Sequence, residues 1–364
     1  MVQEPKGGRG ERIAMRRLPP DEDVMAPFPA VETTSSRLPS RFGFLLTSPQ
    51  ITSFVRPFRK KGSAAIAFLR GANVDRAPVQ RPLDPTLGRI GSLEVRLATT
   101  PREIRAAQRL RYKVFYEAGR ALPHTASALA RRDFDEYDAI CDHLLVLDHA
   151  APSNLGEPAR KLRGIPARTA HPAVVGTYRL LRQEVAERHF GFYTQAEYDI
   201  APIITAHPTK RFLELGRSCV LEAYRTKRTV ELLWHGIWAY VLHHRIDVML
   251  GCASMEGTDP DALALPLSFL HHHAAAAEGW RARAVPGRYV PMDRLPASRV
   301  DAKVALHALP PLIKGYLRLG ARFGDGAVVD TQFGTTDVLV VLPVSAISPR
   351  YVTHFGADAG RHAA

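Results

Sequence analysis

Hydrophobic and polar residues follow strand-like periods from residue 93 onward. The run Leu93–Ala98, LEVRLA, alternates between apolar and polar residues, as a half-buried strand does. Longer apolar runs, bounded by polar or turn residues, predict five more strands. In chain order these are Asp142–Asp148, Ala173–Leu181, Arg211–Leu221, Asp247–Met255 and Asp337–Pro343.

Helices are predicted between these strands. Thr100-Pro101-Arg102-Glu103 is typical of a helix start, with a capping Thr, Pro at the first position and Glu in the capping-box place, and the helix is expected to run to Gly119. Thr229–Arg245 is apolar almost all round, which predicts a buried helix. The helix-like stretch Asp301–Phe323 leaves core packing, an acyl pocket and a membrane face open. Strands and helices mixed in one block predict an α/β or α+β domain.

The N-terminal quarter of the chain has a different composition. Residues 1–90 hold 11 of the 28 prolines and show no sustained period, so we expect a disordered, basic extension. Within it, Arg41–Lys61 mixes Phe and Leu with a basic end, which suits either an anionic bilayer surface or a solvated linker. We therefore predict an extension at 1–90, one folded domain at 91–355 and a tail at 356–364.

Charge and composition narrow the class of protein. The 364 residues carry a net charge of +13, which favours anionic partners. No stretch is apolar enough to span a bilayer, and the first residues lack the apolar core of a secretory signal. We expect a cytoplasmic protein, with peripheral contact at the inner membrane left open. The scattered Cys141, Cys219 and Cys252 form neither a disulfide framework nor a zinc cage.

Several kinds of site have no support in the sequence. Neither a phosphate-binding P-loop nor a dinucleotide fingerprint is present. The histidines, including His271–His273, lack an HExxH motif or supporting carboxylates, so no metal is expected. A nucleophile elbow is absent, which argues against covalent catalysis.

The predicted strand Arg211–Leu221 contains two charges in an apolar setting. Glu214 and Arg217 need partners there, because burying an unpaired charge is costly. Positions three apart face opposite sides of a regular strand, but Gly216 would permit a bulge that brings both side chains to one side. Glu214 would then accept a proton and Arg217 would orient it. A structural ion pair is the alternative.

Two charged loops flank this strand in the sequence. Arg225, Lys227 and Arg228 precede the predicted helix Thr229–Arg245, and a helix N-terminus with nearby cations favours phosphate. The acidic run Arg132–Asp142 would attract a cationic substrate or form a solvated loop. Its carboxylates are Asp133, Asp135, Glu136, Asp138 and Asp142.

The order of the motifs resembles a known family. The series comprises LRYKVFYEAG (110–119), FDEYDAICDHLLV (134–146), GTYRLL (176–181), ELGRSCV (214–220), LLWHGIWAY (232–240) and GCASMEGTDP (251–260). It resembles the ornithine N-alpha-acyltransferases of ornithine-lipid synthesis, a bacterial group of the GNAT superfamily whose members are often labelled hemolysins. The resemblance covers Leu93 to Phe355.

That resemblance implies a fold and a reaction. The GNAT fold has a mixed sheet, flanked by helices, that is splayed between strands four and five, here Arg211–Leu221 and Asp247–Met255. The family implies that a 3-hydroxyacyl group passes from acyl carrier protein to the alpha-amine of ornithine, giving a lyso-ornithine lipid. Acyl-phosphopantetheine on the carrier would be the donor, and no cofactor would be tightly bound. Partners would be the carrier protein and ornithine, without nucleic acid.

The group is similar to the acyl-homoserine-lactone synthases, which implies roles for individual residues. Glu214 and Arg217 match their active-site Glu-x-x-Arg, and Asp135 and Asp138 match an Asp-x-x-Asp that binds the amino substrate. Leu110, Arg111 and Phe115 match a segment that closes the substrate pocket. We expect the pantetheine arm to lie along the residues that follow Arg217. These are Cys219, Val220, Arg225, Lys227, Arg228 and Thr229.

Two departures bear on the alternatives. The loop 225–230 lacks the glycines of a coenzyme A loop, which suits a carrier protein that presents one pantetheine phosphate. A Trp expected in lactone synthases after the segment around Phe115 is absent. A lactone synthase or another N-acyl amino acid synthase stays the enzymatic alternative, and a basic membrane-active protein the non-enzymatic one.

Overall fold

The structure is a computed structural model that describes residues 83–84, 86–152, 172–349 and 351. These residues belong to one compact unit that begins at Leu83. The predicted membrane-surface segment Arg41–Lys61 and the tail 356–364 lie outside the described residues.

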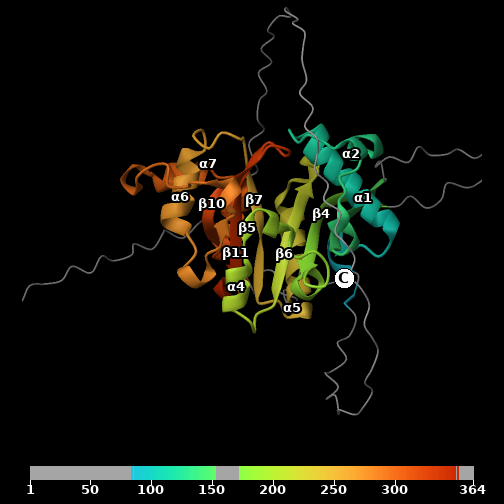
Figure 1. Ribbon diagram of the computed structural model, residues 1–364. Coiled ribbons are helices and arrows are strands. Elements are labelled where there is room, and N and C mark those ends of the chain that lie inside the picture. The colour runs from blue at the N-terminus through green and yellow to red at the C-terminus, as the bar shows by residue number, and fades with distance from the viewer. Residues whose placement is uncertain (1–82, 85, 153–171, 350, 352–364) are drawn as a thin grey trace, which may run out of the picture. The chain divides into compact units, whose positions relative to one another are not determined.

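Helices and strands alternate along this unit (Figure 1). The strands are β1 (Thr86–Ile90), β2 (Leu93–Leu97), β3 (Asp142–Pro152), β4 (Pro172–Arg182), β5 (Tyr198–Asp199), β6 (Phe212–Val220), β7 (Val248–Glu256), β8 (Arg283–Ala284), β9 (Tyr289–Val290), β10 (Arg322–Asp330) and β11 (Thr335–Pro343). The α-helices are α1 (Pro101–Tyr112), α2 (Thr125–Ala130), α3 (Gln183–Ala186), α4 (Ala201–Ala206), α5 (Lys227–His244), α6 (Ala264–Ala274), α7 (Ala302–Ala308) and α8 (Pro311–Leu319).

The strands form one mixed sheet in the order β1-β2-β3-β4-β6-β7-β11-β10-β8-β5. The central neighbours are antiparallel except β6 and β7, which run parallel. Alternate residues of β3 enter different apolar clusters: Leu144 packs with residues of α5, and Leu145 packs with residues of α1. Helices α5 and α1 therefore cover opposite faces of the sheet.

The sheet opens where β6 and β7 part. They pair only between Phe212–Glu214 and Val248–Leu250. Beyond Glu214, β6 stays paired with β4 on its other side, while β7 stays paired with β11. This confirms the predicted splay, and with it the mixed α/β fold class, and leaves one edge of β6 available beside the opening.

Three boundaries differ from the sequence prediction. Strand β1 lies inside the range 1–90, so the folded unit starts before residue 91; its five residues include Gly88 beside a register shift, too short a pattern to detect. The stretch Asp301–Phe323 is not one helix, because two prolines at 310 and 311 separate α7 from α8 and its last residues enter β10. The first helix changes at residue 113 into a π-helical turn, Lys113–Glu117.

Helix α8 contributes to the core, while an acyl pocket and a membrane face stay predictions for this stretch. Its Ile313, Tyr316 and Leu319 are buried in the cluster that also contains α5, so this stretch packs into the core. Among the described residues, none of the helices combines the length and apolar character that crossing a bilayer requires.

Candidate active site

Arg217 lies at a bulge in β6, directly beyond the point where β7 departs. The pairing with β4 runs from Thr177–Cys219 to Arg179–Gly216, so β6 carries one residue more than β4 in this interval. The predicted bulge is therefore present. The left-handed residue is Arg217 itself, with φ of 50°, rather than Gly216. A non-glycine residue in this conformation costs about 1–2 kcal/mol, so the surrounding contacts must hold it.

Within the described part of the chain, Glu214 and Arg217 have separate partner groups. The Glu214 carboxylate accepts hydrogen bonds from the backbone N–H of Tyr193 (2.8 Å) and of Thr194 (2.7 Å), and from the Thr194 hydroxyl. Burial raises the pKa of Glu214, although the Thr194 and Tyr193 hydrogen bonds act in the opposite direction. Glu214 thus fastens the 3-10 turn Tyr193–Ala196 to β6.

Three arginines and three aspartates form what we call the guanidinium–carboxylate network. Arg111 of α1 binds Asp133 (Nε–Oδ2, 2.8 Å) and Asp138 (Nη2–Oδ2, 2.7 Å). Arg179 of β4 binds Asp135 (Nη1–Oδ1, 2.6 Å). The network consists of Arg111, Arg179, Arg217, Asp133, Asp135 and Asp138.

Arg217 completes the network on the side of the opening. Its guanidinium lies 3.4 Å from oxygens of both Asp133 and Asp135, and it donates to the Tyr193 hydroxyl (3.2 Å). The rings of Tyr193 and Phe333 also contact this guanidinium, with centroids at 4.7 and 4.9 Å. Burial alone would lower the pKa of Arg217. Tyr193, Asp133 and Asp135 raise it by a larger amount, so the pKa lies above its usual value and the side chain stays charged.

The network divides into an inner and an outer part. Arg111 and Asp138 are 1% and 6% exposed, and the Asp138 oxygens are occupied by Arg111, by Gln108 and by the backbone N–H of Asp135. Burial would raise the pKa of Asp138, yet the Arg111 hydrogen bonds bring it well below the usual range. Arg217 and Asp135, at 15% and 20% exposure, are the members that an incoming molecule can reach.

Phe115 lies next to this outer part. Its ring meets Phe333 edge to face (5.8 Å), and Phe333 in turn covers Arg217. The structure thus brings Arg111, Phe115, Asp135, Asp138 and Arg217 into one region, on four segments of the chain. Sequence reasoning missed Arg179, Tyr193 and Phe333; Arg179, a charge within the apolar run GTYRLL, carried the same signal as Glu214.

The residues expected along the pantetheine arm lie in two settings. Cys219 is buried against α1, and burial raises the pKa of its thiol to about 12, which is unsuited to nucleophilic catalysis. Val220 ends β6 and its carbonyl accepts from Arg225 Nε (3.2 Å). At the N-terminus of α5, Thr226 caps the helix through the Thr229 N–H, while Lys227 and Arg228 are exposed. The predicted phosphate contact therefore has cations and an accessible helix start.

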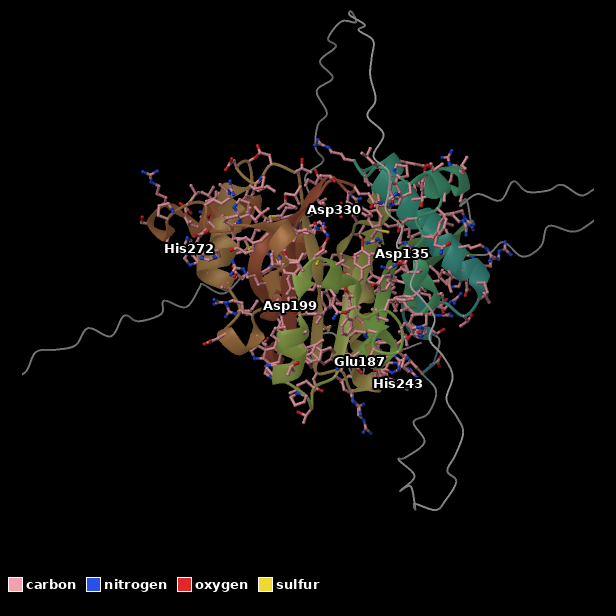
Figure 2. All side chains as sticks on the ribbon, viewed as in Figure 1. Asp135, Glu187, Asp199, His243, His272 and Asp330 are labelled. Carbon is pink, nitrogen blue, oxygen red and sulfur yellow. The ribbon has the colours of Figure 1, made fainter. Side chains whose placement is uncertain are left out.

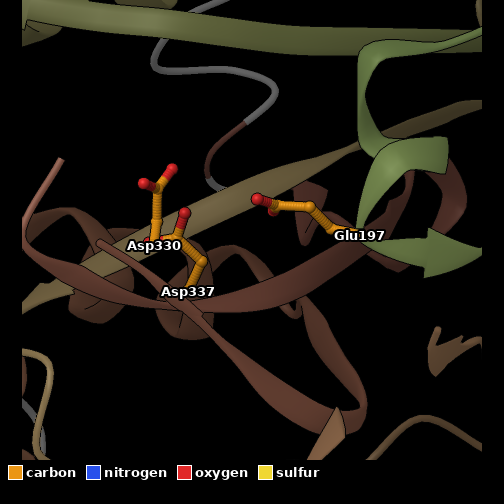
Figure 3. Close-up of side chains that lie close together, drawn as sticks. All are labelled: Glu197, Asp330 and Asp337. Atoms are coloured by element: carbon orange, nitrogen blue, oxygen red, sulfur yellow. The ribbon is translucent and has the colours of Figure 1, made fainter. Parts of the chain in front are cut away.

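A second acidic group, which we call the acidic triad, lies on the β7–β11 side of the opening. It consists of Glu197, Asp330 and Asp337, whose carboxylates point toward one another (Figure 3). One oxygen of each lies within 4.8 Å of the others. Burial, and next the charge of Glu197, raise the pKa of Asp337 to about 7. None of the predicted site residues belongs to the triad, because Glu197 lies far in sequence from the β10–β11 hairpin that carries Asp330 and Asp337. Figure 2 labels Asp330, together with Asp135 of the network.

Comparison with known proteins identifies the family. A model of the acetyltransferase (GNAT) domain matches residues 110–235. The L-ornithine N(alpha)-acyltransferase of Brucella abortus (strain 2308) is 54% identical over 76% of this chain and 92% of its own length. The namesake proteins of Agrobacterium fabrum and Rhizobium meliloti are 54% and 53% identical, over 88% and 92% of their lengths and 75% and 79% of this chain. The chain belongs to the L-ornithine N(alpha)-acyltransferase family.

This acyltransferase also has distant structural neighbours. An N-acyl amino acid synthase from uncultured soil microbes aligns with a TM-score of 0.35 at 10% identity, covering 70% of this chain and 91% of its own. The acyl-homoserine-lactone synthase LasI aligns with a TM-score of 0.34 at 10% identity, covering 73% and 96%. The TM-scores are low, so the family assignment rests on the sequence relatives alone. Those relatives confirm the resemblance that the motifs indicated.

Proposed function

We propose that this acyltransferase moves a 3-hydroxyacyl group from acyl carrier protein to the alpha-amine of ornithine. The ornithine nitrogen attacks the thioester carbonyl carbon, a C–N bond forms, the C–S bond breaks and the carrier thiol leaves. The alpha-ammonium first gives one proton to the base or to solvent, so that the neutral amine attacks. After attack, the nitrogen loses a second proton, which the thiolate takes up. The products are a lyso-ornithine lipid and free carrier protein, and because the product is a lipid we expect it to leave toward a membrane surface.

The observation that carries the proposal is Arg217 at the mouth of the opened sheet. The end of β6–β7 pairing at Glu214 leaves a strand edge along which the amides of a pantetheine arm can pair. Arg217 stands on that same strand, charged, wedged between two aromatic rings and within reach of solvent. A guanidinium with an open side is suited to the alpha-carboxylate of an amino acid, which it binds through paired N–H donors.

Two features support acyl carrier protein as the acyl donor: the charge of the protein and the loop before α5. Arg225, Lys227 and Arg228 are exposed around the start of α5, where free N–H groups favour a phosphate. The net charge of +13 would draw an acidic carrier protein toward the enzyme. Since loop 225–230 has no glycine, we expect coenzyme A thioesters to be poorer donors than carrier thioesters.

The proton acceptor remains a proposal as well. Glu214 is 5% exposed and its oxygens already accept three hydrogen bonds. We propose that Glu214 has one of two roles. As the base, it would accept the proton through a water molecule; as a positioning residue, it would hold Tyr193 against Arg217. Backbone N–H groups of residues 217–219, next to the bulge, are placed to stabilise the oxyanion.

The test uses the full chain with a 3-hydroxyacyl carrier protein thioester and ornithine. Thiol release and the mass of the product should report an N-acylated ornithine, with less product from the coenzyme A thioester. Arg217→Met should lower kcat/KM for ornithine by about 100-fold, as loss of a charge-assisted contact of about 3 kcal/mol requires.

Arg131→Met is a matched control. Arg131 also has a left-handed backbone, with φ of 47°, but its side chain is 74% exposed and forms an ion pair with the surface residue Glu117. Its turnover should stay within about 2-fold of wild type. Product from S-adenosylmethionine in place of ornithine would instead support the lactone-synthase alternative, and absence of any transfer would support the membrane-active one.

A further inference from the structure

The acidic triad is built rigidly, although two of its oxygens lack a donor at full hydrogen-bonding geometry. The backbone around Glu197 is fixed by Tyr198, whose hydroxyl donates to the carbonyls of Gly326 and Asp337 (both 3.0 Å). Asp330 Oδ1 accepts from the N–H groups of Gln332 and Phe333 (2.8 and 2.9 Å). A frame of this kind holds three carboxylates together, where their mutual repulsion would otherwise separate them.

These two oxygens of the triad, Glu197 Oε2 and Asp337 Oδ1, are buried. Neither meets a donor at full hydrogen-bonding geometry, although neutral groups lie near both: the Ser254 and Thr335 hydroxyls beside Asp337 and the Cys252 thiol beside Glu197. The two side chains are 3% and 7% exposed. Arg288 is the cation that pairs with the triad, through the other oxygen of Glu197 (3.2 Å). Leaving buried carboxylate oxygens unpaired is costly, so the arrangement is suited to a cationic ligand that brings its own donors.

Two short segments connect the triad with Arg217. The turn that ends at Glu197 begins at Tyr193, which contacts the Arg217 guanidinium. Four residues of 3-10 helix rise about 8 Å. The hairpin turn that starts at Asp330 brings the Phe333 ring to the same guanidinium. The turn from Tyr193 to Glu197 and the hairpin turn from Asp330 to Phe333 therefore each link a member of the triad to a side chain that contacts Arg217.

We propose that the acidic triad binds the side-chain ammonium of the ornithine acceptor, while Arg217 holds its alpha-carboxylate. This inference rests on the proposed function. An ammonium has three N–H donors, which match one oxygen from each carboxylate. An ammonium held among three carboxylates stays protonated and is no nucleophile, so the triad directs acylation to the alpha-amine. A divalent cation is the competing occupant.

The test compares ornithine with norvaline, which lacks only the side-chain amine. Wild type should prefer ornithine by about 100-fold in kcat/KM, because a site built to bind a group rejects the analogue without it. Asp337→Asn and Glu197→Gln should lower kcat/KM for ornithine by about 10- to 100-fold and leave norvaline within about 3-fold. Asp325→Asn, on β10 but bound to Tyr289, should change neither.

Several outcomes would overturn the assignment. Equal losses on both substrates would make the triad structural, and equal use of both substrates by wild type would remove its role in selection. The triad would be a metal site if MgCl₂ or CaCl₂ stabilised the wild type but not Asp337→Asn, and if EDTA abolished acyl transfer. A wild type that transfers no acyl group would refute the proposed function instead. In that case the triad is still tested by the melting temperature: a rise with ornithine that norvaline does not produce supports it, and equal shifts reject it.

Discussion

The two sides of the opened sheet treat buried charge in opposite ways. On the β4–β6 side, three guanidinium groups meet three carboxylates, and the inner pair Arg111–Asp138 is satisfied by ion pairs and hydrogen bonds. On the β7–β11 side, three carboxylates of the described residues meet the guanidinium of Arg288, and two of their oxygens lack a donor at full hydrogen-bonding geometry. The difference distinguishes a structural role from a binding role. Charges that are already paired stabilise the fold, whereas unpaired charges at a rigid site are suited to bind a ligand of opposite charge.

Breaking the paired side should have the largest effect on stability. Asp138→Ala leaves the buried Arg111 guanidinium without its main partner, which should lower the free energy of unfolding by about 3–5 kcal/mol. Denaturant titration measures the change. Glu117→Ala, which removes the partner of the exposed Arg131, should cost less than about 1 kcal/mol. Comparable losses in both variants would mean that the inner pair contributes no more than a surface pair.

Neutralising Asp337 of the acidic triad should raise the free energy of unfolding rather than lower it. The pKa of Asp337 is raised to about 7, so its ionised form is disfavoured in the folded chain. The contribution of Asp337 to the free energy of unfolding therefore falls as the pH rises from about 4 through 7. At pH 8, Asp337→Asn should be more stable than wild type by about 1–3 kcal/mol, and the difference should vanish near pH 4.

The groups that face Asp337 set the limits of this measurement. Glu197 and Asp330 add negative charge, Arg288 opposes it through Glu197, and the hydroxyls of Ser254 and Thr335 act to lower the pKa. Melting temperatures from pH 4 to 8 would decide the matter. A variant that is less stable than wild type at pH 8 would show that the carboxylate is satisfied after all.

Glu214→Gln should have the smallest effect on stability. The amide oxygen can still accept from Thr194, but the amide nitrogen then faces the Tyr193 N–H, which should cost about 1–2 kcal/mol. Kinetics separate the two roles of Glu214. If Glu214 is the base, the variant should lose kcat and should also lose the increase of kcat with pH that the wild type shows. If Glu214 only places Tyr193, the KM for ornithine should rise and the pH dependence of kcat should be unchanged.

The opened sheet and its charged strand could be predicted because they leave local signals. Apolar runs marked β2, β3, β4, β6, β7 and β11 to within a few residues, whereas β10 and the short strands β1, β5, β8 and β9 were missed. Two charges inside FLELGRSCV marked β6 as unusual. The bulge followed from the spacing of Glu214 and Arg217. Which residue takes the left-handed conformation did not follow, because glycine is the residue that adopts it most readily and tertiary contacts hold Arg217 there instead.

The acidic triad could not be found in the same way. Glu197, Asp330 and Asp337 come from a short turn and two strands, and nothing local relates residue 197 to residue 337. One signal was present: Asp337 opens the apolar run DVLVVLP, a charge at the start of a buried strand. Only the sheet order, which places β11 between β7 and β10, gives that charge its neighbours.

Gly251 lies where β6 and β7 part, and a methyl group there would approach the Leu215 carbonyl oxygen to 2.3 Å. The missing side chain thus lets two backbones touch at the fork before they diverge. A bulkier residue would push the two backbones apart, so the fork between β6 and β7 would start earlier along both strands.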